Sequence, residues 1–217
     1  YIKEGWTTDD YHLMKAMDRL AQLGGMAMVH AENGGAVDYL EDKLLTGSDA
    51  PAHFVATRPA AMEEEAIFRA IRMAEVTGCP LYIPHNTTAR ALRHIQEARG
   101  SGLPVFAETC PQYLTLTEEV IREQGALAKI GPPIRNAEDR AALWQALADG
   151  TIQVVGTDHA PKHKDVDGDF LTQPFGSPQI ETLLPLVYDG GVNAGRISPV
   201  RVAQVLSENP ARIFGLY

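Results

Sequence analysis

The sequence predicts an α/β fold in which parallel β-strands alternate with α-helices. Four short apolar runs begin near residues 26, 81, 104 and 151, and stretches with helical periodicity separate them. Strands that alternate with helices in this way form βα units and a parallel sheet. No glycine-rich phosphate loop follows the runs, so a nucleotide-binding doubly wound fold is the less favoured member of this class.

The first half of the chain contains two of the four predicted strands. Thr7-Thr8-Asp9-Asp10 is a capping signal for an amphipathic helix, which Gly24-Gly25 ends, and Gly78 ends another. In chain order we expect a helix at 7–23, a strand at 26–30, a helix at 37–45, a loop at 47–57, a helix at 63–77 and a strand at 81–85. The short apolar run 26–30 is typical of a strand that is covered on both faces.

The second half repeats this unit. We expect a helix at 87–99, a strand at 104–109, a helix at 137–149, a strand at 151–155, a polar loop at 162–178, and helices near 180–188 and 199–208. The strand at 151–155 runs into a sharp turn that contains Asp158 and His159 and ends at Pro161.

Composition excludes several classes of partner. The net charge of -9 and the pI near 5.2 argue against binding to nucleic acid or to an anionic membrane surface. Two cysteines are too few for a disulfide framework, and no stretch resembles a signal peptide or a transmembrane segment. We therefore predict a reduced, soluble, cytoplasmic protein.

Three predicted strands end in residues that bind metals. His30 and His85 end the strands near residues 26 and 81, and Asp158 follows the strand near residue 151. Each histidine alone could simply be hydrogen-bonded to a loop. In a parallel barrel, however, all strand ends face the same rim, where such folds carry their chemistry. Two imidazoles and a carboxylate at that rim would suit a zinc-like ion that keeps a position free for water.

Three neighbouring residues have less certain roles. His159 could orient a metal ligand or cap the turn. Glu108 follows a strand and should reach the same rim, although packing around Pro111 is the simpler interpretation. Cys110 could act as a nucleophile, but no base lies near it in the sequence.

Several sequence blocks resemble the cyclic amidohydrolases of the amidohydrolase superfamily, which are the dihydropyrimidinases (hydantoinases), allantoinases and dihydroorotases. The blocks are His-Ala-Glu-Asn-Gly from His30, Glu-Thr-Cys-Pro-Gln-Tyr-Leu from Glu108, Gly-Pro-Pro-Ile-Arg from Gly131, Gly-Thr-Asp-His-Ala-Pro from Gly156 and Glu-Asn-Pro-Ala-Arg-Ile-Phe-Gly-Leu from Glu208. They occur in the family's order over nearly the whole chain. Gln112 favours the hydantoinase branch, because the other branches more often carry histidine there.

The resemblance implies a metal-dependent (β/α)8 barrel of the TIM type with two zinc ions. In that family a His-x-His pair ends the first strand, a carboxylated lysine ends the fourth, histidines end the fifth and sixth, and an aspartate ends the eighth. His30, His85 and Asp158 match the last three. The chain would then hold roughly strands five to eight and their helices.

The family's His-x-His pair and lysine have no counterpart in this sequence. We therefore expect residues 1–217 to be the C-terminal half of such a barrel, without the N-terminal half and without the family's small β-sandwich domain. On that reading the two missing motifs would precede Tyr1. Tyr1 itself lies within a residue of the position where hydantoinases carry a substrate-binding tyrosine.

The same resemblance implies residues that bind the substrate. Backbone groups at Gly131 and around Phe175 would hold the substrate's amide, although hydantoinases usually carry asparagine at the place of Phe175. Lys162 stands where dihydroorotases carry a histidine that contacts the substrate carboxylate. It could serve an acidic ring substituent, or it could be a solvated lysine of the loop.

The predicted function is hydrolysis of a hydantoin or dihydropyrimidine ring by zinc-activated hydroxide, with Asp158 as general base and acid. Two alternatives remain open: a dihydroorotase or allantoinase, and a non-catalytic scaffold related to dihydropyrimidinases. The expected partners are a small cyclic amide and, following the family, further copies of the same chain in a dimer or tetramer. This chain alone should lack activity, because half of the ligands would be missing.

Overall fold

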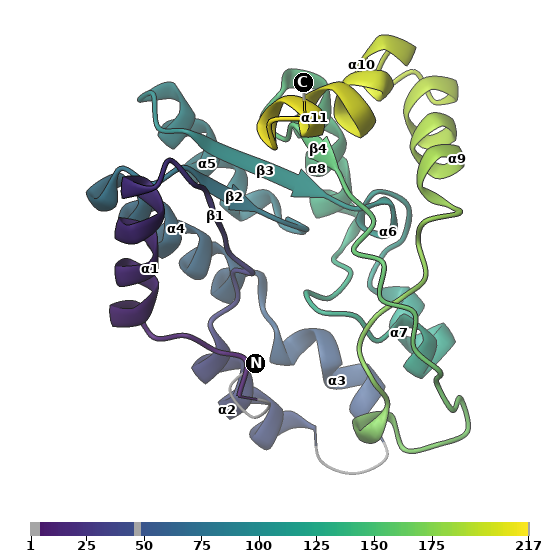
Figure 1. Ribbon diagram of the computed structural model, residues 1–217. Coiled ribbons are helices and arrows are strands. Elements are labelled where there is room, and N and C mark those ends of the chain that lie inside the picture. The colour runs from purple at the N-terminus through teal and green to yellow at the C-terminus, as the bar shows by residue number, and fades with distance from the viewer. Residues whose placement is uncertain (1–4, 46–48, 217) are drawn as a thin grey trace.

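A four-stranded parallel sheet forms the centre of the computed structural model, which describes residues 5–45 and 49–216 (Figure 1). The strands are β1 (Ala27–Met28), β2 (Leu81–Ile83), β3 (Val105–Thr109) and β4 (Val154–Val155). They lie in the order in which they occur along the chain, and each pairs parallel to the one before it. Leu81 of β2 has Ala27 of β1 on one side and Val105 of β3 on the other. The predicted α/β fold with four parallel strands is confirmed.

Helices connect the strands. In chain order they are α1 (Asp10–Gln22), α2 (Gly34–Leu44), α3 (Ala50–Thr57), α4 (Ala60–Thr77), α5 (Ala89–Gly100), α6 (Pro111–Thr115), α7 (Glu119–Gln124), α8 (Ala137–Asp149), α9 (Leu183–Tyr188), α10 (Pro199–Ala203) and α11 (Asn209–Ile213). Two short 3-10 helices are η1 (Gly125–Ala128) and η2 (Phe170–Thr172), and two π-helical segments are η3 (Asp189–Asn193) and η4 (Gln204–Glu208).

Local sequence signals explain where the main helices begin and end. The Asp9 side chain accepts the backbone N–H of His12 and so caps α1, and Asn136 caps α8 in the same way. Gly78 and Gly150 end α4 and α8 in the left-handed conformation (φ 67° and 89°), which glycine adopts without steric cost. The ends of α4 and α8 thereby fix where the chain turns back to begin β2 and β4.

The main core lies between the sheet and the helices that flank it. Figure 1 shows α1, α4 and α5 along the sheet and the C-terminal helices α10 and α11 near β4, and α8 packs against α5. The residues that form this core are nearly all buried. The largest of the fully buried ones include Met17, Ile67, Ile71, Leu81, Ile83, Ile95, Leu143 and Leu147. This packing holds the strand ends in fixed positions.

A second, smaller core lies away from the sheet. It joins α3, α7, η1 and η2 through Ala50, Phe54, Ile121, Ala126 and Phe170, with Phe175 packed against it. The Phe54 ring lies 5.5 Å from that of Phe170 and 5.9 Å from that of Phe175, between centroids. The long loop after β4 is therefore supported by a hydrophobic cluster of its own.

The structure corrects several expected boundaries. The loop expected at 47–57 is wrong for 50–57, which form α3 with Pro51 in the first turn, where a missing N–H costs no hydrogen bond. The strands are shorter than expected, and β4 contains only Val154 and Val155. The loop at 162–178 contains the short turn η2. Helix α9 continues into η3, and α10 continues through η4 into α11. Across 5–45 and 49–216, no helix has both the length and the apolar composition needed to cross a bilayer.

Candidate active site

A cavity of about 850 Å³ lies where the strands end. Its lining includes the residues that follow β1, β2 and β4, together with segments 129–131 and 171–176. Because parallel strands present their carboxyl ends at one edge, residues far apart in the sequence meet there. All the predicted site residues that fall within the described ranges line this one cavity: His30, His85, Gly131, Asp158, Lys162 and Phe175.

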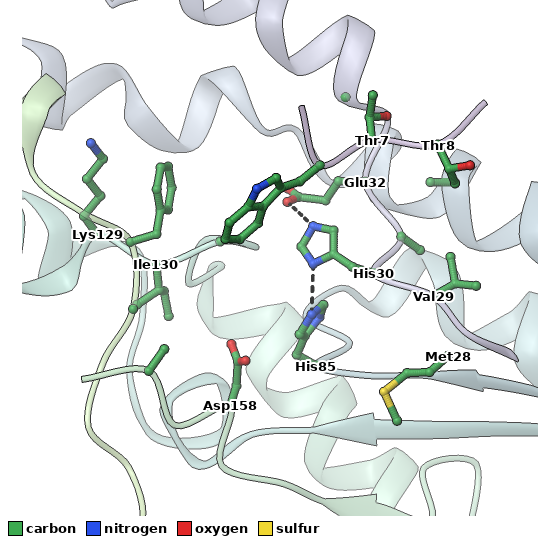
Figure 2. A pocket seen from close by; sticks show the side chains of 18 of the residues that line it. Thr7, Thr8, Met28, Val29, His30, Glu32, His85, Lys129, Ile130 and Asp158 are labelled. Atoms are coloured by element: carbon green, nitrogen blue, oxygen red, sulfur yellow. Dashed lines mark hydrogen bonds and ion pairs between the residues drawn. The ribbon is translucent and has the colours of Figure 1, made fainter. Parts of the chain in front are cut away.

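The two histidines are in contact. Nδ1 of His30 and Nε2 of His85 lie 3.0 Å apart, and the ring centroids are separated by 4.7 Å in an edge-to-face arrangement (Figure 2). His30 follows β1 and His85 follows β2, so the pairing of these neighbouring strands brings the rings together. The two histidines that were expected at the strand ends, His30 and His85, therefore lie next to each other.

Asp158 faces the same cavity from the turn after β4 (Figure 2). His85 and Asp158 are the non-glycine residues with positive φ among the described residues, at 41° and 48°. A left-handed backbone is disfavoured for most side chains and costs of the order of 1–3 kcal/mol where the surrounding structure imposes it. Backbone strain is therefore present at His85 and Asp158, two of the three residues predicted at the strand ends.

Burial and neighbouring charges tune these groups. Burial, with the nearby His30, lowers the pKa of His85 to about 3, so its imidazole is neutral at physiological pH. Partial desolvation raises the pKa of Asp158, and His30 opposes that rise. A neutral imidazole is the form that binds a metal, and a carboxylate with a raised pKa accepts a proton more readily.

Glu32 is a site residue that strand-end reasoning missed. Its Oε2 lies 3.0 Å from Nε2 of His30, and its side chain is only 5% exposed. Burial opposes ionisation of Glu32, but the hydrogen bond from His30 and the charge of Arg58 outweigh it and lower the pKa of Glu32. Its place two residues after His30 was the available signal, since alternate residues of an extended segment point the same way.

The opposite wall of the cavity is held by Lys129. Its Nζ donates to the carbonyl oxygens of Phe170, Leu171 and Gln173 at 2.7–3.0 Å, and it lies 4.9 Å from the centroid of the Phe175 ring. The backbone carbonyl of Lys129 accepts the N–H of Gly176 at 3.2 Å. The Gly176 N–H is therefore already engaged, and backbone groups at Gly131 and around Phe175 stay the predicted amide-binding positions. Tyr1 lies outside the described residues.

Three residues with open roles are now placed. Nδ1 of His159 accepts the backbone N–H groups of Gln179 and Ile180 at 3.0 and 3.3 Å, so His159 caps a turn. Cys110 is fully buried, and burial followed by the charges of Glu108 and Asp158 raises the pKa of its thiol, which argues against a nucleophile. Glu108 accepts the Tyr82 hydroxyl at 2.5 Å beneath the site.

The paired histidines fit a zinc ion in part. Two nitrogens that each bind a tetrahedral zinc at about 2.0–2.1 Å lie about 3.3 Å apart, close to the observed 3.0 Å between His30 and His85. Within 5–45 and 49–216, no three His, Cys, Asp or Glu side chains are grouped closely enough to hold a metal ion. Asp158 thus shares the cavity with the imidazoles without joining them in a cluster of three.

Comparison with known proteins shows similarity along the entire chain. The amidohydrolase family model matches residues 1–217. The chain is 39% identical to a D-hydantoinase of Ralstonia pickettii over 96% of its length, and 42% identical to a D-hydantoinase of Streptomyces coelicolor over 97%.

Solved structures give the same picture. The fold superimposes on the D-hydantoinase of Bacillus sp. AR9 with a TM-score of 0.90 at 38% identity over 95% of this chain. For the dihydropyrimidinase of Brevibacillus agri the TM-score is 0.92 at 35% identity over 97%. The chain spans about half the length of the relatives it matches, 47–48% in these four comparisons.

Proposed function

Because this chain belongs to the amidohydrolase family, we propose that the intact protein hydrolyses a cyclic amide or imide ring of the hydantoin or dihydropyrimidine type. The observation that carries the proposal is the meeting of His30, His85 and Asp158 at one cavity where parallel strands end. The names of the similar proteins, D-hydantoinase and dihydropyrimidinase, support this substrate class.

We propose in addition that residues 1–217 form the C-terminal half of a TIM-type barrel. Strands β1 to β4 would take the places of strands five to eight. The support is the in-order parallel sheet and the matched relatives, which are about twice as long. The His-x-His pair, the carboxylated lysine and the β-sandwich domain would belong to other parts of the intact protein.

His30 and His85 would hold a zinc ion through the facing nitrogens Nδ1 and Nε2. When bound, zinc would polarise the ring carbonyl and make a water acidic enough to attack it near neutral pH. The two imidazoles come from neighbouring strands whose pairing fixes their separation, so the chain itself sets this half of the coordination geometry.

Asp158 would carry the proton during ring opening. Its carboxylate accepts a proton from the attacking water and returns it to the amide nitrogen as the C–N bond breaks. Backbone groups at Gly131 and Phe175 would hold the amide in place, and Lys129 would keep the segment that carries Phe175 against the cavity. Both proton transfers would then depend on a single side chain.

The test compares Asp158→Asn with the wild-type protein at full length, using dihydrouracil and hydantoin as substrates. Asparagine tolerates the left-handed backbone at this position, so the change removes the base without altering the turn. We expect kcat to fall by about 10²- to 10⁴-fold while zinc remains bound. Asp167→Asn, on the exposed loop, is the matched control and should leave the rate unchanged. Equal rates for Asp158→Asn and wild type would refute the assignment.

Removal of metal tests the zinc proposal independently. Treatment of the full-length protein with a chelator should abolish ring opening, and added Zn²⁺ should restore it, because the imidazole pair binds zinc through neutral nitrogens. Metal analysis of the untreated protein should find zinc. A metal-free and inactive protein would instead support the non-catalytic scaffold.

Lys162 supports a second candidate function. It lines the cavity, where an ammonium group could pair with a carboxylate on the ring, as in a dihydroorotase-type substrate. Lys162→Ala should then raise KM for a carboxylated ring and leave KM for hydantoin unchanged. An equal effect on KM for both substrates would argue against the dihydroorotase-type function and favour the hydantoinase-type function.

A further inference from the structure

His30 uses both ring nitrogens. Nδ1 faces Nε2 of His85 at 3.0 Å, and Nε2 lies 3.0 Å from Oε2 of Glu32 (Figure 2). A carboxylate only accepts hydrogen bonds, so Glu32 requires the proton of His30 to sit on Nε2. The lone pair of Nδ1 is then directed toward Nε2 of His85, the side on which the two imidazoles would share a metal ion.

Arg58 lies behind Glu32. Its Nη1 is 3.6 Å from Oε2 of Glu32, its Nη2 is 2.6 Å from Oε1 of Glu41, and its side chain is only 2% exposed. On another side, its guanidinium carbon lies 4.9 Å from the centroid of the Phe175 ring. One planar cation therefore contacts both the carboxylate that holds His30 and the aromatic ring of the opposite cavity wall.

Arg58 is itself fixed by a buried network. Arg135 donates to the backbone carbonyl of Arg58 and pairs with Glu63 at 2.8 Å. Glu63 accepts the backbone N–H of Thr87 at 2.8 Å, two residues after His85. The segments that carry His30, His85 and Phe175 are thus tied together through buried arginine and glutamate side chains.

This network is an expensive way to stabilise a fold. Removing two opposite charges from water costs about as much as their attraction returns, and apolar residues of the same size often do as well. A buried ion pair beside a site is better explained by what it orients. Carboxylate partners of metal-binding histidines fix the ring and its tautomer in this way.

We propose that Glu32 and Arg58 are positioning residues of the site: Glu32 sets the tautomer and orientation of His30 for a metal ion, and Arg58 holds Glu32 and the Phe175 wall in one frame. The proposal rests on the proposed function for the identity of the site. Its test measures metal binding and ring tautomer, which do not depend on turnover.

The first experiment compares Glu32→Gln with Glu41→Gln in the full-length protein. Both changes remove a carboxylate that pairs with Arg58, and Glu32 is the one whose carboxylate is hydrogen-bonded to His30. Zinc affinity is measured by competition with a chromophoric chelator, and the His30 tautomer by ¹⁵N shifts of the metal-free protein. We expect Glu32→Gln to weaken zinc binding by about 10- to 100-fold and to shift the tautomer, with Glu41→Gln near wild type.

Zinc affinity and tautomer unchanged in Glu32→Gln would overturn the proposal. So would an equal loss in both variants, because that would indicate general loosening around Arg58. A wild type that binds zinc but opens no ring would refute the proposed function only, and the Glu32→Gln comparison would still decide the positioning role.

The second experiment addresses Arg58. Arg58→Lys keeps the charge but loses the plane that contacts Glu32, Glu41 and the Phe175 ring together. We expect about a 10-fold loss of zinc affinity together with a rise in KM. Arg72→Lys is the matched control, since Arg72 also lies 4.9 Å over an aromatic ring, that of Phe68, and pairs with Glu75. Equal behaviour of the two variants would refute the role of Arg58.

Discussion

Glu108 shows how a residue beneath the site can shape it. Its carboxyl group accepts the Tyr82 hydroxyl at 2.5 Å and the backbone N–H of His85. Burial raises the pKa of Glu108, these two hydrogen bonds oppose the rise, and the nearby Asp158 adds to it. The contact to His85 acts on a residue whose φ is 41°, so Glu108 helps to hold the strained backbone that presents the imidazole.

Gly156 makes room for the carboxyl group of Glu108, so a larger residue at position 156 should destabilise the fold. A Cβ at position 156 would lie 2.5 Å from Cδ and Oε2 of Glu108. Gly156→Ala should therefore destabilise the protein by about 1–3 kcal/mol, as overpacking of a filled site does. Urea unfolding measures this. Gly100→Ala, at the end of α5 with open space around it, should be neutral or stabilising by up to about 1 kcal/mol. Equal midpoints for the two variants would contradict the prediction.

Sequence reasoning found the residues that end strands and missed those that reach the site from elsewhere. His30, His85 and Asp158 were identifiable because each follows an apolar run at a predictable rim. Arg58 gave no such signal: it lies far from Glu32 in the sequence, between the loop expected at 47–57 and the helix expected at 63–77. Its position depends on the packing of α3 against the second core, which no local pattern encodes.

At the scale of elements, the loop after β4 is ordered by two lysines. Lys129 donates to three carbonyl groups of that loop, and Nζ of Lys164, within the loop, donates to the carbonyl oxygens of Leu127 and Lys129 at 3.2 and 3.0 Å. The loop lacks regular structure for most of its length, so these side chains replace backbone pairing. They set the position of Phe175 and of the cavity wall.

Lys164 gives a prediction about pH. Burial, with the charge of Lys129, lowers the pKa of Lys164 from 10.5 to about 8. Between pH 8 and about 10.4 the unfolded state then binds more protons than the folded state, so this residue's contribution makes stability rise with pH across that window. After allowance for solvent screening we expect a change of about 1 kcal/mol.

The measurement compares urea midpoints of wild type and Lys164→Met from pH 7 to 10.5. The difference between the two proteins isolates the residue from the other groups that titrate at high pH. Lys15→Met, on the exposed face of α1, is the control and should follow wild type. A constant difference across the range would show that the Lys164 pKa is not lowered.

Elements were predictable where their pattern was long. The helices expected at 63–77 and 137–149 correspond to α4 and α8, because both have apolar periodicity and a glycine stop. Short helices were not predictable from the sequence. Both α3 and α6 have a proline in their first turn, and such a sequence resembles that of a turn. Strand lengths were overestimated because apolar character continues past the paired residues: Val29 lies outside β1, although its N–H still donates to the Tyr82 carbonyl at 3.1 Å.

At the scale of the molecule, the sheet has two open edges within the described residues. β1 pairs with β2 and β4 with β3, and the other side of each pairs with no described strand. Met28 of β1 is 58% exposed, and Leu23, nearby in the sequence, is an exposed large apolar side chain as well. Unpaired strand edges with apolar surface tend to pair with other chains. A homo-oligomer of the intact protein and a cytoplasmic location remain predictions.

The 217-residue chain expressed alone should therefore self-associate. Light scattering or sedimentation across a range of concentrations should show species larger than a monomer, and ring-opening activity should be absent because the proposed ligand set is incomplete. A monodisperse, stable monomer would contradict this expectation and would show that the open edges are tolerated.

The sequential order of the strands has a consequence for biosynthesis. Because each strand pairs with the strand that precedes it, every new βα unit emerging from the ribosome finds its docking surface already made. The cavity, however, needs the loop after β4, which supplies Asp158 and Phe175. Translation can therefore build the sheet progressively, while the cavity is completed only when this late segment has been made.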